Sequence, residues 1–163
     1  MLVAILSDVH DNITNLLTAL AIAERQGCRH LLLAGDIATL STLRTLREEW
    51  EYGIDLVFGN NEWERDAHLK LAEQFHHCNH HGDCADFTLE ERRIYMTHYP
   101  HIAEQALLRG GYDAVFYGHT HYAEQRIGKN CLIANPGEIA GVRGEPGFAI
   151  YNTADNSLRF CKI

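Results

Sequence analysis

Residues 114–121 read AVFYGHTH: an apolar and aromatic run ends at Gly118, and His119 and His121 follow with one residue between them. This pattern predicts a buried strand that ends by presenting two imidazole rings. Side chains at positions i and i+2 of extended backbone point the same way, so both histidines can bind metal at one place. A metal site at this strand end needs further ligands from other parts of the chain.

Three earlier apolar runs end in polar side chains in the same way. The runs cover residues 2–6, 31–34 and 56–58, and we expect each to be a strand followed by a helix. The helices are expected over about 13–26 with Asn12 or Asp11 as the N-cap, from about 41 with Ser41 as a possible cap, and over roughly 62–76. Such alternation predicts parallel strands with right-handed crossovers.

The second half of the chain predicts hairpins around one short helix. Strands are expected over 85–89, 93–97, 114–117, 124–127, 131–134, 148–152 and 158–161, and the helix over 101–109. The sequence contains no linker, fixed-period repeat or low-complexity stretch. We therefore expect one α/β domain over residues 1–163.

Composition and charge exclude several classes of protein. No apolar run reaches the roughly 18 residues of a membrane helix, and charged Asp8 follows the short run 2–6 too closely for a signal peptide. Five cysteines without a C-x-x-C pair indicate reduced thiols, so we expect a cytoplasmic protein. The net charge of −8 argues against non-specific nucleic-acid binding, but not against a small phosphorylated substrate, because bound cations can invert the local field. A homo-oligomer is compatible with the sequence.

Seven candidate metal ligands occupy the same kind of position, at the carboxyl end of an apolar strand. They are Asp8, His10, Asp36, Asn60, His98, His119 and His121. In open α/β sheets the loops at that edge converge and bind ligands. Seven nitrogen and oxygen ligands are too many for one tetrahedral ion and suit two ions that share a carboxylate. Asp36 stands alone after its strand and is the natural bridge, and the two histidines of residues 114–121 would be divided between the ions.

Each motif taken alone has an ordinary interpretation. Gly35-Asp36 is most often a turn, Asp8 with His10 can be a helix-cap cluster, and a lone His98 is usually a hydrogen-bonded loop residue. Their common order after apolar strands is what favours a metal centre. A second group, His76, His77, His80 and His81 with Cys78 and Cys84, lacks regular ligand spacing, so we interpret it as a solvated helix end and loop.

The motifs Asp8-x-His10, Gly35-Asp36, Gly59-Asn60, His98 and Gly118-His119-Thr120-His121, in this order, resemble the calcineurin-like metallophosphoesterases, most of all small phosphodiesterases of the YfcE type. The resemblance implies a four-layer α/β/β/α sandwich with two facing mixed sheets. It also implies one ion held by Asp8, His10, Asp36 and His121, and a second held by Asp36, Asn60, His98 and His119. Asp36, Asn60 and His98 are then expected to act directly in catalysis.

The expected reaction is hydrolysis of a small or nucleotide-like phosphate diester, by in-line attack of a hydroxide that bridges two divalent ions. Mn²⁺ is the expected ion, and the ligand set also suits Ni²⁺, Fe, Co²⁺ or Zn²⁺. The alternatives are a phosphomonoesterase, including a phosphoprotein phosphatase, and a non-catalytic scaffold on the same fold.

Three positions depart from the wider family pattern and bear on the substrate. Many members carry a histidine after the Asn ligand, thought to protonate the leaving group; here that position is Asn61, which favours a diester. Tyr99 replaces a frequent glycine, and Glu138 replaces a usual serine. Arg143 is a candidate phosphate contact, because guanidinium matches two phosphate oxygens, or else a solvated loop charge. Asn61 and Arg143 are thus the candidate substrate contacts.

Overall fold

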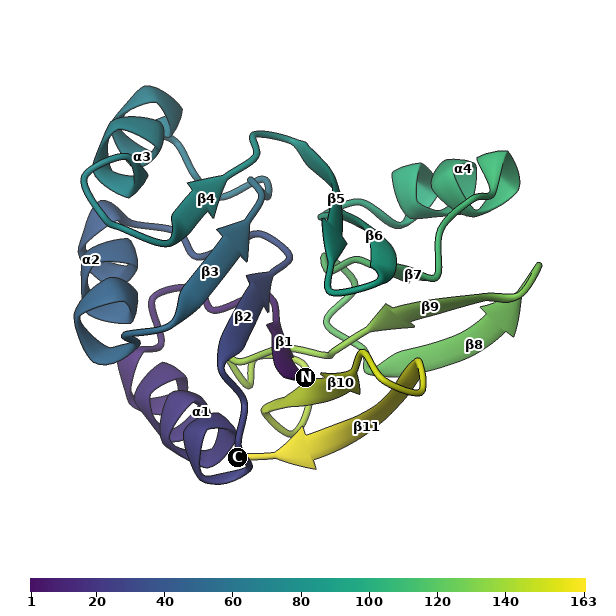
Figure 1. Ribbon diagram of the computed structural model, residues 1–163. Coiled ribbons are helices and arrows are strands. Elements are labelled where there is room, and N and C mark those ends of the chain that lie inside the picture. The colour runs from purple at the N-terminus through teal and green to yellow at the C-terminus, as the bar shows by residue number, and fades with distance from the viewer.

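The computed structural model, which describes all of residues 1–163, contains one sheet of six strands in the order β11-β10-β1-β2-β3-β4 (Figure 1). Its strands are β1 (Leu2–Leu6), β2 (His30–Leu33), β3 (Gly53–Leu56), β4 (Cys78–His80), β10 (Gly147–Asn152) and β11 (Ser157–Lys162). Strands β1 to β4 are parallel, and β10 and β11 form an antiparallel hairpin beside β1. The sheet is therefore mixed, and its four parallel strands end at the same edge.

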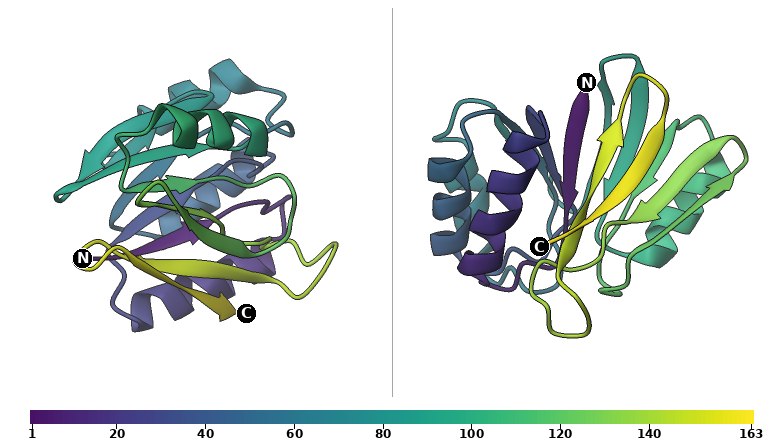
Figure 2. Two further views of the ribbon diagram at one scale, coloured as in Figure 1. Left: turned by 90° about the vertical axis from the view of Figure 1, so that its right-hand side faces the viewer. Right: turned by 90° about the horizontal axis from the view of Figure 1, so that it is seen from below.

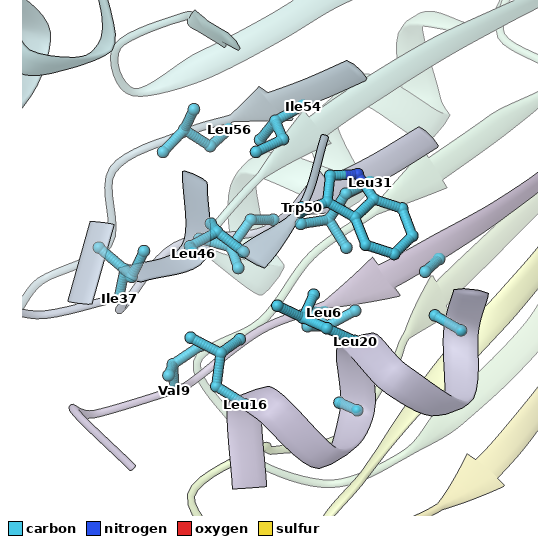
Figure 3. Close-up of a cluster of buried hydrophobic side chains, with 14 of the residues drawn as sticks. Leu6, Val9, Leu16, Leu20, Leu31, Ile37, Leu46, Trp50, Ile54 and Leu56 are labelled. Carbon is cyan, nitrogen blue, oxygen red and sulfur yellow. The ribbon is translucent and has the colours of Figure 1, made fainter. Parts of the chain in front are cut away.

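Three helices cover one face of this sheet: α1 (Ile13–Arg25), α2 (Leu40–Glu49) and α3 (Arg65–Ala72). Figure 3 shows Leu16 and Leu20 of α1 in the same apolar cluster as Leu6 of β1 and Trp50. The apolar residues of α1 recur at helical spacing, which is why one stripe of the helix is buried. Asn12 caps α1, since its side chain accepts a hydrogen bond from the backbone of Asn15.

The second sheet has five strands in the order β5-β6-β7-β9-β8. They are β5 (Cys84–Leu89), β6 (Arg92–Thr97), β7 (Ala114–Phe116), β8 (Glu124–Gly128) and β9 (Cys131–Asn135). Helix α4 (Pro100–Arg109) packs on its outer face through a separate apolar cluster. Strands β6, β7 and β9 are parallel, whereas β5 and β8 are antiparallel to their neighbours.

The two sheets face each other and share an apolar core (Figure 2). Alternate residues of β1 point to opposite sides: Val3 and Ile5 belong to the core between the sheets, whereas Ala4 and Leu6 pack under the helices. This double burial explains why β1 is a continuous apolar run. The expected four-layer α/β/β/α sandwich with two facing mixed sheets is confirmed. No helix combines the length and apolar character needed to cross a membrane.

The third strand was wrongly predicted, because β3 covers Gly53–Leu56 and not residues 56–58. A buried charged residue, Asp55, lies inside the strand and interrupts the apolar run by which a buried strand is recognised in a sequence. The N-cap of α2 is also different, since Thr39 occupies it and Ser41 lies within the helix. The hydroxyl of Thr39 donates to Asp11 instead of capping the helix.

The region from Glu62 to Cys84 differs most from the prediction. Helix α3 begins only at Arg65, because the buried carboxylate of Glu62 accepts backbone hydrogen bonds from two preceding loops. The helix ends at Ala72 instead of reaching residue 76. The histidine-rich segment is not simply a loop, since Cys78–His80 forms β4 and pairs with β3. Among its histidines, His76 and His77 are exposed, whereas His80 and His81 are partly buried.

Candidate metal centre

All seven predicted ligands come together where strands from both sheets end. Asp8, Asp36 and Asn60 follow strands of the six-stranded sheet, and His98, His119 and His121 follow β6 and β7 of the other. Backbone contacts join the two sets: the amide of His119 donates to Asp8 Oδ2 at 3.1 Å, and His98 Nδ1 donates to the carbonyl of Ala34 at 2.8 Å. The facing sheets thus meet in a hydrogen-bonded seam at the candidate site.

One group of converging donor atoms consists of Asp8, His10 and His121, whose ligand atoms lie within 4.8 Å of one another. Asp8 Oδ1 is 3.3 Å from His121 Nε2 and 3.7 Å from His10 Nε2. The two imidazole rings are stacked with centroids 5.1 Å apart. Asp8 is fully buried, so its charge needs a nearby compensating group.

A second group consists of Asp8, Asp36 and His98. Asp36 Oδ2 lies 3.5 Å from His10 Nε2 and 3.5 Å from His98 Nε2, which puts this carboxylate between the two groups. Asn60 Oδ1 extends the second group, at 3.1 Å from His98 Nε2 and 2.8 Å from His119 Nδ1. Asp8 also belongs to both groups, which the sequence did not suggest.

These atoms fit divalent cations by their chemistry. Asp8 Oδ1 and His10 Nε2 are buried without any hydrogen-bond partner, which is rare for polar atoms unless an ion or water meets them. His98 donates through Nδ1 to a carbonyl, so in the neutral form of the ring a lone pair on Nε2 points toward Asn60 Oδ1. Lone pairs that converge from carboxylate, amide and imidazole groups suit a first-row divalent ion.

Interactions within the centre shift the pKa values of two candidate ligands, His10 and Asp36. The carboxylate of Asp8, 3.7 Å from Nε2, raises the pKa of His10 above its ordinary value, in spite of burial. Burial alone would raise the pKa of Asp36, but the nearby imidazole of His98, 3.5 Å from Oδ2, and two hydrogen bonds from Asn61 outweigh it and hold that pKa well below its ordinary range. The carboxylate of Asp36 is therefore ionised at neutral pH, and a cation that binds beside it has to compete with protons for the imidazole of His10.

Five of the seven candidate ligands have left-handed backbone conformations. The φ angles are 54° at Asp8, 45° at His10, 57° at Asp36, 72° at His119 and 69° at His121. Such φ values are uncommon outside glycine, although Asp, Asn and His tolerate them best. Concentrated backbone strain of this kind is typical of functional sites, where it aims side chains that a relaxed loop would direct elsewhere.

Two glycines allow the strand ends to approach so closely. A Cβ atom on Gly118 would lie 1.9 Å from Ser7 Oγ and 2.9 Å from Asp8 Oδ2. A Cβ atom on Gly59 would lie 2.1 Å from Asp36 Oδ1. The glycines that precede His119 and Asn60 are thus required by packing, and a side chain at either would push the ligand loops apart.

Two buried carboxylates near the ligands were not recognised from the sequence as parts of the site. Glu62 accepts hydrogen bonds from the backbone amides of Ile37 at 2.5 Å and Gly59 at 2.7 Å. Glu138 accepts from His121 Nδ1 at 2.7 Å and from backbone amides of the following loop. Glu138 stood out only as a replacement for serine, and contacts made to backbone amides leave no spacing pattern to detect.

The two candidate substrate contacts differ in their surroundings. Asn61 donates to both oxygens of Asp36, from its backbone amide at 2.9 Å and from Nδ2 at 2.7 Å, so it lies at the centre. A hollow of about 180 Å³ borders it, lined by Asp11, Ala38, Thr39, Asn61, Trp63 and Glu64. Arg143 lies on the exposed loop after Glu138, and its guanidinium makes no hydrogen bond or ion pair within the chain.

The second histidine group does not form a comparable site. The largest hollow, about 470 Å³, lies beside α3 and β4 and includes His76, His77 and His80 in its lining. No three metal-capable atoms converge there. His81 and His30 instead each donate to the buried carboxylate of Asp55 at 2.6 Å, so these histidines stabilise the sheet edge.

Comparison with known proteins agrees with this geometry. Residues 1–156 match the sequence profile of the calcineurin-like phosphoesterase superfamily domain. The chain is 30% identical to phosphodiesterase MJ0936 of Methanocaldococcus jannaschii over 165 aligned positions, which cover 98% of this chain and 97% of that protein.

Solved structures agree with the sequence match. An archaeal phosphodiesterase superposes with a TM-score of 0.88 at 26% identity, and the YfcE phosphoesterase of E. coli with a TM-score of 0.69 at 21% identity. Both alignments cover the whole of each chain. The converging ligands, the facing sheets and the match over almost its full length identify this chain as a member of the calcineurin-like phosphoesterase superfamily.

Proposed function

We propose that the protein is a phosphodiesterase that uses two divalent metal ions to hydrolyse a small or nucleotide-like phosphate diester. The observation that carries this proposal is the convergence of carboxylate, amide and imidazole lone pairs, with Asp8 Oδ1 and His10 Nε2 buried and unpartnered. The relationship to a protein named as a phosphodiesterase supports the same reaction.

Two ions would divide the ligands and share Asp36. One ion would be held by Asp8, His10, Asp36 and His121, and the other by Asp36, Asn60, His98 and His119. The position of Asp36 Oδ2, equally distant from His10 and His98, supports its role as the shared ligand. When bound, such ions activate water at neutral pH and neutralise the charge that develops on phosphate oxygens. Mn²⁺ is the ion we propose.

The protein groups around the ions bind and orient the ester. Asn61 holds both oxygens of Asp36, which keeps the shared carboxylate in one orientation. Its carboxamide cannot give a proton to a leaving oxygen at neutral pH. A diester or another ester with a good leaving group is therefore the better substrate, since such a group departs without a general acid.

An aromatic surface beside the centre supports a substrate with a planar group. Trp63 is 87% exposed and borders the hollow that includes Asn61. Exposed tryptophan of this extent is unusual for an isolated surface residue, and its indole face can stack on a nucleobase or aryl ring. This position favours nucleotide-like or aryl esters over small alkyl phosphates.

The test compares hydrolysis of bis(p-nitrophenyl) phosphate and p-nitrophenyl phosphate by the Mn²⁺-loaded protein. We expect the diester to be preferred and the D36N variant to lose nearly all activity. D86N is the matched control, because Asp86 is exposed on β5 and pairs with Arg93. A strong monoester preference would point to a phosphomonoesterase. Unchanged activity in D36N would show that the centre is assigned wrongly, and absence of any hydrolysis would favour a scaffold.

A further inference from the structure

We infer that Glu138 is a positioning residue that fixes the tautomer and orientation of His121 at the metal centre. The inference rests on the proposed function in one respect, namely that His121 binds an ion through Nε2. It concerns a residue outside the seven ligands, at the position where the family resemblance leads one to expect serine. Glu138 follows the Asn135-Pro136-Gly137 turn that ends β9, and it is only 1% exposed.

The Glu138 carboxylate is held by four N–H groups. Oε2 accepts from His121 Nδ1 at 2.7 Å and from the backbone amide of Val142 at 2.9 Å. Oε1 accepts from the amides of Arg143 at 2.6 Å and Gly144 at 2.8 Å. Three successive backbone amides therefore close around the carboxylate, so its orientation is set by the main chain of the loop and not by a flexible partner.

This contact determines which nitrogen of His121 carries the proton. A carboxylate oxygen can only accept, so Nδ1 must donate and Nε2 is left with a free lone pair. Nε2 lies 3.3 Å from Asp8 Oδ1, the buried oxygen that has no hydrogen-bond partner. The lone pair thus faces the group formed by Asp8 and His10, which is where an ion is needed. Carboxylate partners of this kind commonly orient metal-binding histidines and make them more basic.

Serine could not reproduce this arrangement. A hydroxyl has one oxygen with two lone pairs, too few to accept from His121 and from three backbone amides together. Glutamine is more informative, because its shape is close to that of glutamate while one oxygen becomes an NH₂ donor. With that NH₂ facing His121, Nδ1 must accept and Nε2 becomes protonated, which blocks it as a ligand.

The experiment measures the tautomer and the metal affinity of E138Q, with E145Q as the matched control. Glu145 lies on the same loop but is exposed and pairs with Lys162. In the metal-free wild-type protein, long-range ¹H–¹⁵N NMR spectra of labelled histidine should show His121 protonated at Nδ1. In E138Q the signal should move to the Nε2–H form, and Mn²⁺ affinity from calorimetry should fall about 10- to 100-fold. E145Q should match the wild type in both.

The inference is overturned if folded E138Q keeps the Nδ1–H tautomer or binds Mn²⁺ within twofold of the wild type. Should E138Q fail to fold, E138S provides the same two measurements with the same expectations. The NMR measurement uses protein without metal and without substrate. It therefore tests the positioning role even if the wild-type protein hydrolyses no ester, an outcome that would instead refute the proposed function.

Discussion

Asn61 shows how one side chain can limit the chemistry of the centre. Both of its hydrogen bonds are made to Asp36, so the residue supports a ligand and offers no proton to a departing oxygen. Without an acid at this position, the leaving group has to depart as an anion. The rate should then depend steeply on the acidity of the alcohol or phenol released.

The N61H variant should make that dependence shallower. A histidine next to Asn60 can protonate the leaving oxygen, an effect worth about 10²-fold or more for alkyl leaving groups and little for p-nitrophenolate. The measurement is kcat/KM over a series of esters with leaving groups of graded pKa. N61A, which loses the side-chain hydrogen bond to Asp36 without adding an acid, should lower all rates together. If kcat/KM depended equally steeply on the pKa of the leaving group in N61H and in the wild type, this view of Asn61 would be contradicted.

Asp55 is a buried charge with a structural role away from the centre. His30 of β2 and His81 after β4 each donate to it, Asn79 of β4 donates at 3.1 Å, and Phe87 of β5 stacks on His81. Burial alone would raise the pKa of Asp55, but these hydrogen bonds hold it well below its ordinary value. A carboxyl group with a lowered folded-state pKa stabilises the protein above its unfolded-state pKa, near 3.9, and this stabilisation disappears as the pH falls further.

The D55N variant should therefore be destabilised by about 1–3 kcal/mol at pH 7, where Asp55 is ionised in both states. The difference from the wild type should shrink as the pH falls below about 4, because the wild-type carboxyl then loses the same contribution. Urea unfolding of both proteins at pH 7, 5 and 3.5 measures this difference in unfolding free energy. The control is D66N, a change at an exposed position in the first turn of α3. Its unfolding free energy should stay within about 0.5 kcal/mol of the wild-type value at all three pH values. If the difference in unfolding free energy between D55N and the wild type increased as the pH falls, this explanation would be ruled out.

At the scale of elements, Glu62 connects two ligand loops that leave different strands. Its carboxylate accepts from Ile37, just after Asp36, and from Gly59, just before Asn60. Both amides lie in loops with no regular structure of their own. The relative position of Asp36 and Asn60 thus depends on one buried side chain that is not itself a candidate ligand.

Replacement of Glu62 by alanine should leave these two amides without acceptors in a buried site. Each unsatisfied buried group costs roughly 1–3 kcal/mol, so we expect E62A to lose about 2–4 kcal/mol of unfolding free energy. Chemical denaturation without metal gives this value. E64A is a close control, because Glu64 is exposed and its side chain makes no capping hydrogen bond. If E62A and E64A were equally stable, the role given to Glu62 would be incorrect.

Secondary structure was predictable where one physical pattern dominated. The run of residues 2–6 identified β1 because the strand is buried on both faces, and the spacing of Leu16 and Leu20 identified α1 because one stripe is buried. Strand β3 was misplaced because Asp55 lies within it, and its buried charge is acceptable only with histidines that are distant in the sequence. Strand β4 is three residues long, which is too short to show alternation.

The same reasoning separates the predictable from the unpredictable parts of the centre. Its seven candidate ligands were identifiable because each follows an apolar strand, and parallel strands bring such positions to one edge. Glu62 and Glu138 were not, because their partners are mainly backbone amides supplied by the folded loops. The part played by Asp8 in both donor groups depends on how the two sheets face each other, which no local pattern encodes.

At the scale of the molecule, the centre spans both sheets. Asp8, Asp36 and Asn60 come from one sheet, and His98, His119 and His121 from the other. A bound ion would therefore link the two halves of the sandwich in the native state and would find no such arrangement in the unfolded chain. Ligands that bind only the native state raise its stability by mass action.

Mn²⁺ should accordingly raise the melting temperature. At a free concentration of 100 times Kd the added stability is about 2.7 kcal/mol, which corresponds to roughly 5–10 °C for a chain of this size. A chelator should reverse the shift, D36N should abolish most of it, and D86N should retain it. Differential scanning calorimetry with and without metal provides the measurement. A shift of equal size in D36N would show that the ion binds elsewhere.

The pairing of β1 with β10 has a consequence for the nascent chain during its synthesis on the ribosome. β1 lies inside its sheet between β2 and β10, and Leu2 pairs with Asn152. Its second partner is translated about 140 residues later, a delay on the order of ten seconds or more. Throughout that time the nascent chain offers an open, strongly apolar strand edge to neighbouring chains. Slow translation or premature termination before Gly147 would prolong this exposure, so yield in cells should depend on how soon the C-terminal hairpin emerges.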